Sequence, residues 1–581
     1  MQIRERRNGE KGASLFVTVA ALVWIVIPML GLFIDLGILY SVKARLQAAV
    51  DGAALAAARA LNLGQDTSAQ AASAQQNAVN WFYANFPNGN WATYSTVMTT
   101  SNVSVVDSPS SANLRVVTVT ASTDVPTWFM KYLGFNFTNL TATGQASRKD
   151  MVAMLVLDRS GSMCSVNGAD PNPDPCNKAN TDTPCSAMIG YAKDFTGSFA
   201  EGRDKIGLLT FADGYYLESA PTTNFQSVLG YTNESGSGSG TIDNISCNGG
   251  TGTAAAMSMA YNELYKIAEP GAMNLIMLMT DGLPNTLVYN YYATPGTKST
   301  LALKSSSLCK DASGNPVASG WNTSTSARGW LPASGSISAG ISMNSNGTGY
   351  MSDIPNSTIG AFYTADPSEV AEDGPYQIVM FDPRQTSDSN NNQGNSIYVS
   401  TTGGSPTAPG CVFSNSGDQD TNYSDFAWLP SQDVFGNQVA PANEYTSLSL
   451  TGSENILTGP TYQGGFYSSN DWTAAHAAAL NATDNSAYNI RTNATLPAYI
   501  FTIGLGGNHG NPPDPVLLQR MANDPNGDQF NNPPTYSACS TEPTCINYPN
   551  QPQGTFYYSP SAATLGQAFL QMASQILRLS H

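Results

Sequence analysis

At 581 residues, the chain is longer than a single hydrophobic core usually requires, so two or three folded units are expected. Its formal net charge is -17, and only 12% of its residues are charged, which is about half the usual share. Because nucleic-acid affinity depends on basic side chains that neutralise phosphates, this acidic chain without basic clusters is not expected to bind nucleic acid.

The N-terminal end has the pattern of a membrane anchor. Residues 13–34 form a nearly unbroken apolar run without charge, long enough to cross about 30 Å of hydrocarbon. The tail before it, residues 1–12, carries four basic residues: Arg4, Arg6, Arg7 and Lys11. Since positive flanks stay in the cytoplasm, we expect a cytoplasmic tail, one transmembrane helix and a bulk outside the cytoplasmic membrane.

Two kinds of processing are alternatives to a retained anchor. A cleaved secretory signal is disfavoured because the apolar region is too long and no small-x-small cleavage site directly follows it. Prepilin-type cleavage after Gly12 is the other alternative, but Val17 stands where pilins usually carry Glu. We expect an uncleaved anchor.

Residues 35–148 show the pattern of a long helix followed by a small antiparallel sheet, a pilin-like plan. Apolar side chains recur at three- and four-residue spacing over 35–63, which predicts that the helix continues. Alternating runs at 102–106 and 114–122 predict strands. Asp35, at the outer end of the span, is either an interaction site or a marker of the water boundary.

This region resembles the N-terminal part of TadG-type Flp-pilus assembly proteins. The resemblance is carried by the apolar run with Pro28, the IDLG from Ile34 to Gly37, and the Ala-rich KARLQAAVDGAALAAARAL from Lys43. It implies an accessory protein of tight-adherence pili, anchored in the bacterial cytoplasmic (inner) membrane. The bulk would then be periplasmic or extracellular, in contact with other pilus-assembly or envelope proteins.

A buried strand is predicted at 151–157, where seven apolar residues run without a break up to Asp158. Asp158, Ser160 and Ser162 alternate in the next loop and offer one carboxylate and two hydroxyls. Oxygen donors with no nearby His are what a hard cation such as Mg²⁺ prefers. Alone, this motif is weak, because Asp and Ser also populate ordinary turns.

Further strands and helices alternate along the chain. The predicted strands are 205–211, 274–279 and 498–504, and the predicted helices are 186–199, 254–268 and 562–578. This alternation indicates an α/β fold with a doubly wound parallel sheet, in which sites form at the carboxyl ends of strands. Asp158 and Asp281 should therefore reach the same edge, and Thr251 stands just ahead of a predicted helix.

Together, DRSGSM, GGT and TDG resemble a von Willebrand factor A (VWFA) domain with a metal-ion-dependent adhesion site (MIDAS), covering 151–286 and 470–581. The resemblance implies a bound Mg²⁺, with Mn²⁺ or Ca²⁺ as alternatives, and a partner Asp or Glu in an exchangeable position. The side chains that would hold the cation are Ser160, Ser162 and Thr251 directly, and Asp158 and Asp281 directly or through water.

Two insertions interrupt the domain, one between Ser162 and about Ser186 and a larger one at 287–469. Both leave the predicted sheet after a strand end that carries candidate ligands. We therefore expect the insertions to rise on the same edge as Asp158 and to surround the cation.

The sequence contains eight cysteines: Cys164, Cys176, Cys185, Cys247, Cys309, Cys411, Cys539 and Cys545. No Cys-x-x-Cys pair occurs and the three histidines lie in unrelated segments, so we expect disulfides in an oxidising compartment rather than zinc. We expect two disulfides among the first four, one of them tying the smaller insertion to the Thr251 loop. The other candidate pairs are Cys309 with Cys411 and Cys539 with Cys545.

These features favour a membrane-anchored, metal-dependent binding or adhesion component of Flp (Tad) pilus assembly. The alternative is a structural envelope or pilus component whose metal only stabilises the fold. A hydrolase that uses Ser160 is disfavoured, because no Gly-x-Ser-x-Gly elbow frames it and no His has a motif that ties it to a serine. We expect no enzymatic activity.

Overall fold

The computed structural model describes most of the chain outside the larger insertion. The described residues are 8–62, 66–109, 111–165, 176–212, 215–233, 236–247, 250–269, 271–290, 292–294, 297–298, 359–364, 378–381, 399–400, 413–414, 433, 435–439, 469–506, 512–527 and 550–580. The chain divides into two compact units, residues 1–150 with 577–581, and residues 151–576.

The first unit begins with a helix that contains one irregular turn. Helix α1 (Asn8–Ala21) passes through a π-helical turn, η1 (Leu22–Val26), into α2 (Ile27–Ala60). From Leu15 onward this helix is long and apolar enough to cross a membrane, and side chains such as Trp24 and Phe33 are exposed. The helix is compatible with the single-pass anchor that the sequence predicts.

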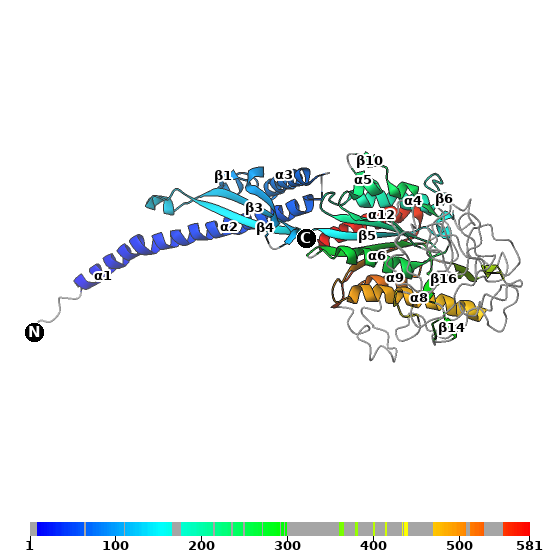
Figure 1. Ribbon diagram of the computed structural model, residues 1–581. Helices are drawn as coiled ribbons and strands as arrows, with labels where there is room; N and C mark the ends of the chain where they lie inside the picture. The colour runs from blue at the N-terminus through cyan, green and yellow to red at the C-terminus, as the bar shows by residue number, and fades with distance from the viewer. Residues whose placement is uncertain are drawn as a thin grey trace, which may run out of the picture. The chain divides into compact units, whose positions relative to one another are not determined.

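The rest of α2 packs against a second helix and a sheet (Figure 1). Helix α3 (Thr67–Asn85) begins after Asp66, whose side chain accepts the N–H groups of Ser68 and Ala69 and so caps it. The buried side of α2 is the predicted apolar stripe, with small alanines that allow α3 and the sheet to come close. Its buried members include Val42, Leu46, Val50, Ala53 and Ala57.

The sheet of the first unit is antiparallel and centred on one long strand, β3 (Ser111–Pro126). Strand β4 (Phe137–Lys149) pairs along β3 over nearly its whole length, while β2 (Val103–Ser108) and β1 (Tyr94–Val97) pair with successive parts of it. Short 3₁₀ turns complete this unit: η2 (Asn90–Ala92), η3 (Thr100–Asn102) and η4 (Met130–Leu133). This is the helix and small antiparallel sheet that the pattern of 35–148 predicts.

Asp35 is buried, with only 2% of its surface exposed. Its carboxylate accepts the backbone N–H groups of Trp128 at 2.9 Å, Phe129 at 2.9 Å and Met130 at 2.7 Å. Asp35 therefore binds the connection between β3 and β4, a contact within this unit that the sequence analysis did not specify.

The second unit is built around a six-stranded sheet in the order β21-β20-β12-β5-β7-β8. Its strands are β5 (Met151–Asp158), β7 (Lys205–Phe211), β8 (Tyr215–Thr222), β12 (Met273–Thr280), β20 (Tyr499–Leu505) and β21 (Phe556–Ser559). All neighbours pair in parallel except β7 and β8. The central strands β5 and β12 are buried along their whole length, as expected for apolar runs covered on both faces.

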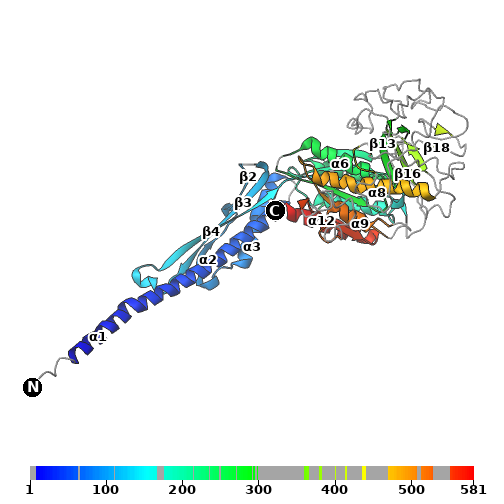
Figure 2. The same ribbon diagram turned by 90° about the horizontal axis from the view of Figure 1, so that it is seen from below.

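Helices cover both faces of this sheet (Figures 1 and 2). Helix α4 (Pro184–Gly197), α5 (Phe225–Leu229) and α12 (Leu565–Leu579) lie on one face, where Phe195 of α4 meets Phe569 of α12 edge to face. Helices α6 (Thr253–Ile267), α8 (Ser469–Thr492) and α9 (Pro515–Ala522) lie on the other. The doubly wound α/β sheet that the sequence predicts is thus present.

Smaller elements lie outside the main sheet. They are η5 (Gly161–Cys164), β6 (Cys176–Asn177), β9 (Tyr231–Asn233), β10 (Gly236–Gly238), η6 (Thr241–Asn244), β11 (Ser246–Cys247), β13 (Thr286–Asn290), β14 (Tyr292–Thr294), β15 (Thr297–Lys298), β16 (Ile359–Thr364), β17 (Ile378–Phe381), β18 (Val399–Ser400), β19 (Phe413–Ser414) and η10 (Ala562–Thr564). Strands β13, β16 and β17 form an antiparallel sheet that belongs to the larger insertion.

A short part of the larger insertion packs on helices α6 and α8. Asn437 donates from Nδ2 to Ser258 Oγ of α6 at 3.0 Å, and the N–H of Gln438 donates to Asn485 Oδ1 of α8 at 2.9 Å. Asp433 holds the turn before this contact, because it accepts the N–H groups of Phe435 and Asn437, each at 2.8 Å. Burial raises the pKa of Asp433 from 3.8 to about 7, against the opposing effect of these hydrogen bonds.

Asp433 should make the stability of this unit depend on pH. A carboxyl group whose pKa is higher in the folded than in the unfolded state favours folding at low pH, and that contribution is lost as pH rises from about 4 to about 7. Asp433→Asn removes the titrating group, so we expect its unfolding free energy to fall less than that of the wild type over this interval. The measurement is urea denaturation from pH 4 to 8. If the unfolding free energies of the two proteins change equally with pH, the raised pKa of Asp433 is contradicted.

Candidate metal-ion site

The first loop of the site follows strand β5. Asp158 is the last residue of β5 and is fully buried, and the backbone N–H of Ser160 donates to its Oδ1 at 2.8 Å. The chain then turns through η5, which brings the Ser160 and Ser162 hydroxyl oxygens within 2.8 Å of each other. One short loop thus presents a carboxylate and two hydroxyls on the same side.

The second loop follows β12, the neighbour of β5 in the sheet. Ser162 Oγ donates to Asp281 Oδ1 at 2.7 Å, and Ser160 Oγ lies 3.4 Å from the same oxygen. Thr280 Oγ1, at the end of β12, donates to Asp158 Oδ2, at the end of β5, at 2.5 Å. This hydrogen bond joins the ends of the two strands. Because β5 and β12 run in parallel, their carboxyl ends and both carboxylates lie at one edge.

The third loop carries Thr251, just before α6. Its backbone N–H donates to Asn285 Oδ1 at 2.6 Å, and the N–H of Asn285 donates back to the Thr251 carbonyl oxygen at 3.0 Å. A Cβ built on Gly282 would lie 3.4 Å from Thr251 Oγ1 and 3.7 Å from Ser162 Oγ. The glycine therefore leaves room between two hydroxyls that come from different loops.

The structure thus brings together all the predicted donors. Hydrogen bonds link Asp158, Ser160, Ser162 and Asp281, and Thr251 Oγ1 lies on the other side of Gly282 from Ser162 Oγ. Asn285 and Thr280 were missed by the sequence analysis. Asn285 follows a Pro in a turn-forming stretch and carried no signal that would distinguish it from an ordinary turn residue, whereas Thr280 belongs to the TDG motif but was not assigned a role.

Burial dominates the electrostatics of Asp158. Removal from water raises the pKa of this carboxyl from 3.8 to about 6, although hydrogen bonds from Thr280, Ser160 and the N–H of Asp281 act in the opposite direction. The next residue, Arg159, extends elsewhere and donates from Nη1 to the carbonyl oxygen of Ser246 at 3.3 Å. A cation bound at the donor cluster would favour the ionised form of Asp158, because opposite charges attract.

The donor set fits a divalent cation. It consists of two carboxylates and three hydroxyls, all hard oxygen ligands of the kind that Mg²⁺, Mn²⁺ and Ca²⁺ accept. Gly282 leaves the space between Ser162 and Thr251 free of a side chain, since a Cβ there would be in van der Waals contact with both hydroxyls. In this arrangement the serines, the threonine and the two aspartates would hold the ion.

Two disulfides fix the loops around this cluster. Cys164 is joined to Cys176, with a Cα–Cα distance of 5.5 Å, and Cys185 is joined to Cys247, with a Cα–Cα distance of 6.3 Å. The sequence predicted two disulfides among these four cysteines, and the structure contains two. Cys309, Cys411, Cys539 and Cys545 lie outside the described residues, so their predicted pairing stays a prediction.

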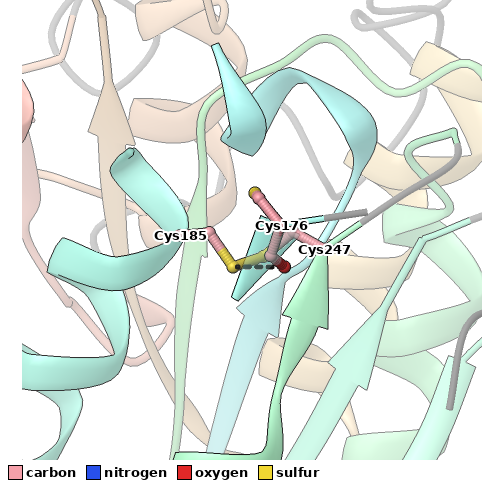
Figure 3. Close-up of side chains that lie close together, drawn as sticks. All are labelled: Cys176, Cys185 and Cys247. Atoms are coloured by element: carbon pink, nitrogen blue, oxygen red, sulfur yellow. Dashed lines mark hydrogen bonds between the residues drawn. A yellow bond between two sulfur atoms is a disulfide. The ribbon is translucent and has the colours of Figure 1, made fainter. Parts of the chain in front are cut away.

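The disulfides lie next to each other, because β6 and β11 pair so that Cys176 faces Cys247. Figure 3 shows Cys176, Cys185 and Cys247 together, and their Sγ atoms lie within 4.8 Å of one another. Each of these sulfurs is already in a disulfide, so the cluster offers no thiolate to a metal. The described parts of the smaller insertion are thereby tied to the loops of Ser162 and Thr251, the edge on which the insertions were expected.

Two family models match separate segments of the chain. Residues 153–283 match the von Willebrand factor type A domain, and residues 12–60 match a family described as putative Flp pilus-assembly TadE/G-like. The first segment contains every donor of the site, and the second contains the apolar helix. A comparison with curated proteins found no match.

Several solved structures show a low overall similarity. The PilB minor pilin from Streptococcus sanguinis is 9% identical with a TM-score of 0.31, covering 84% of this chain and 80% of that one. The vWF domain of the type V pili tip protein Mfa5 from Porphyromonas gingivalis is 14% identical with a TM-score of 0.30, covering 75% and 98%. The pilus adhesin SpaC from Lactobacillus rhamnosus GG is 12% identical with a TM-score of 0.29, covering 82% and 36%. None of these similarities bears on what this chain binds.

Proposed function

We propose that this chain, which joins a TadE/G-like pilus-assembly segment to a von Willebrand factor type A domain, has a role in Flp pilus assembly. It is a membrane-anchored adhesion or binding component. It binds a protein partner through a divalent cation, to which a carboxylate of the partner coordinates. The observation that carries the proposal is the meeting of hydroxyl and carboxylate oxygens from three loops at one sheet edge.

Each donor has a separate part in this mechanism. Asp158 and Asp281 supply the negative charge that balances a divalent cation. Ser160, Ser162 and Thr251 supply neutral oxygens, so the cation keeps its affinity for one more carboxylate. Mg²⁺ is the cation proposed, with Mn²⁺ or Ca²⁺ as alternatives, because it retains exchangeable waters that an Asp or Glu of the partner can replace. The proposal assigns no enzymatic activity to the chain.

The same proposal places the protein in the bacterial cytoplasmic membrane. The apolar helix crosses it once, the basic tail stays in the cytoplasm, and the type A domain lies in the periplasm or outside the cell. The two disulfides support this side of the membrane, because disulfides persist in oxidising compartments. The partners are then other pilus-assembly or envelope proteins.

A structural role is the second candidate, and one observation favours it. Thr280 Oγ1 donates to Asp158 Oδ2, and Ser162 Oγ donates to Asp281 Oδ1, so the donors also join the ends of β5 and β12 to each other. A cation at this position could serve only to hold these loops together, in a protein that contributes to the envelope or pilus as a structural component.

Capture from cells separates the two candidates. Piliated cells that carry the tagged full-length protein are incubated with Mg²⁺ or with EDTA before cross-linking, and the envelope proteins captured with the purified protein are compared. We expect partners that are retained in Mg²⁺, lost in EDTA, and absent for Ser162→Ala, since that substitution removes one neutral ligand and little buried volume.

The control is Ser198→Ala, which removes a hydroxyl from the end of α4, where Ser198 Oγ donates to the Asp194 carbonyl oxygen. This variant should capture the same partners as the wild type. Identical capture by Ser162→Ala and the wild type, together with a lower thermal stability of Ser162→Ala, would favour the structural candidate instead.

A further inference from the structure

The connection between β3 and β4 returns along α2 toward the apolar part of the helix (Figures 1 and 2). This connection, residues 127–136, is called the β3–β4 loop below, and it contains η4. Its backbone is fastened to the helix by the three N–H bonds to Asp35, which is one residue beyond the predicted span of 13–34. The loop also reaches one turn into that span, because a side chain at Gly31 would overlap the Phe129 ring.

The side chains that the β3–β4 loop exposes are large and apolar. Trp128 is 57% exposed, Tyr132 80%, Leu133 65% and Phe135 59%. Exposed large apolar side chains that gather in one short loop mark a contact with a membrane or a partner more often than a surface that stays in water. The adjoining helix surface is apolar and exposed as well, with Phe33 64% and Leu36 56% exposed. The loop therefore continues the surface of the membrane helix.

The backbone of the β3–β4 loop is prepared for a medium that offers few hydrogen bonds. Three of its N–H groups donate to Asp35, and those of Tyr132, Gly134 and Phe135 donate to carbonyl oxygens within the loop at 3.1 Å each. Irregular backbone is tolerated at membrane depth only where its polar groups have partners inside the protein. The buried carboxylate of Asp35 thus supplies the hydrogen-bond acceptors that lipid lacks.

We propose that the β3–β4 loop enters the outer face of the lipid bilayer beside the transmembrane helix and forms a second membrane contact. Trp128 and Tyr132 lie at the level of the lipid headgroups, where Trp and Tyr are enriched in membrane proteins. Lys131, whose Nζ lies 5.3 Å from the centre of the Tyr132 ring, faces the lipid phosphates. Together with the helix, the loop fixes the small antiparallel sheet at the membrane surface. This inference rests on the membrane anchor of the proposed function and not on its metal site.

The test uses the full-length protein in nanodiscs of phosphatidylcholine and phosphatidylglycerol, with and without lipids brominated in the upper part of the acyl chain. Bromine quenches tryptophan emission at short range. The measured quantity is the loss of tryptophan emission on going from plain to brominated lipid. We expect this loss to be smaller for Trp128→Phe than for the wild type, since Trp128 is then no longer present to be quenched. Asp35→Asn, which weakens the attachment of the loop to the helix, should reduce the same quenching without removing the tryptophan.

Trp81→Phe is the matched control. Trp81 is 48% exposed and its ring lies against Gly52, which is about 25 Å farther along α2 than Asp35. This variant should leave the quenched emission unchanged, and an equal result for Trp128→Phe would overturn the inference. Trp24 lies near the middle of the span, so Trp24→Phe is measured with lipids brominated near the end of the acyl chain. If Trp24 is quenched there and Trp128 is not quenched by the upper bromines, the loop contacts something other than lipid. If Trp24 is not quenched either, the anchor of the proposed function fails as well.

Discussion

Replacing Cys185 and Cys247 together by serine is expected to lower the unfolding free energy of the 151–576 unit by about 4 kcal/mol. The bridge closes a loop of 62 residues, and the entropy that a crosslink removes from the unfolded chain grows with the logarithm of that length. The bond also joins the start of α4 to the strand that leads to Thr251, so its loss should loosen one of the three loops of the metal site. Urea denaturation under non-reducing conditions measures the change.

The neighbouring bridge is the matched control. Cys164 and Cys176 are only 12 residues apart, so the corresponding double serine variant should lose just under 3 kcal/mol, about 1.5 kcal/mol less. Both variants delete two buried sulfurs, which leaves loop length as the main difference. Equal losses for the two variants, or a larger loss for the shorter loop, would contradict this account of the stabilisation.

Asp158→Asn is expected to have opposite effects in the absence and presence of Mg²⁺. Without metal, the pKa of Asp158 near 6 means that its ionised form destabilises the folded state above pH 6, by about 3 kcal/mol for a rise of about two units from 3.8. The protonated carboxyl contributes fully to the unfolding free energy below pH 4, and this contribution is lost as pH rises through 6. The asparagine has no such cost, so in EDTA at pH 8 the variant should be the more stable protein.

Mg²⁺ should reverse that order once its concentration is well above one hundred times the Kd, because its stabilisation must then exceed the cost of about 3 kcal/mol. Binding to the folded state alone stabilises the wild type by about 2.7 kcal/mol at one hundred times the Kd and about 4.1 kcal/mol at one thousand times the Kd. The variant lacks one of the two balancing charges and should gain little. Thermal unfolding of the full-length protein across a Mg²⁺ titration measures both effects.

Asp433→Asn serves as the control for this experiment. It makes the same substitution at another buried carboxyl of the same unit, where Asp433 contacts Asn437 and Phe435 rather than the donor cluster. It should keep the full response to Mg²⁺. A wild type that shows no stabilisation by Mg²⁺, Mn²⁺ or Ca²⁺ would remove the metal from the proposed function.

The elements that the sequence predicted best are those with a strong local pattern. The runs at 151–157 and 274–279 were recognised as buried strands because they contain seven and five consecutive apolar residues that end at polar turns, and the structure buries both completely. Helix boundaries were accurate to within a few residues, as for α6, where a Gly-Gly-Thr turn precedes an alanine-rich helix. The order of motifs along the chain was enough to indicate the doubly wound sheet.

The edge strand β8 was not predicted. It pairs antiparallel with β7, with irregular register, and its sequence from Tyr215 to Thr222 has no strict alternation that would distinguish it from a loop. An edge strand is stabilised by its single neighbour more than by its own propensity. Its identity as a strand therefore depended on β7 being in place.

By itself, the sequence determined the kinds of donor available, their order, and the presence of an apolar helix, because these depend on composition and local periodicity. Only the tertiary structure decided which groups meet. It set the pairing of Cys185 with Cys247 and the hydrogen bond from Thr280 to Asp158, and it showed that Asp35 holds a loop more than ninety residues away. Contacts of this kind join residues that are distant along the chain, and each exists only once the sheets and helices between them have packed.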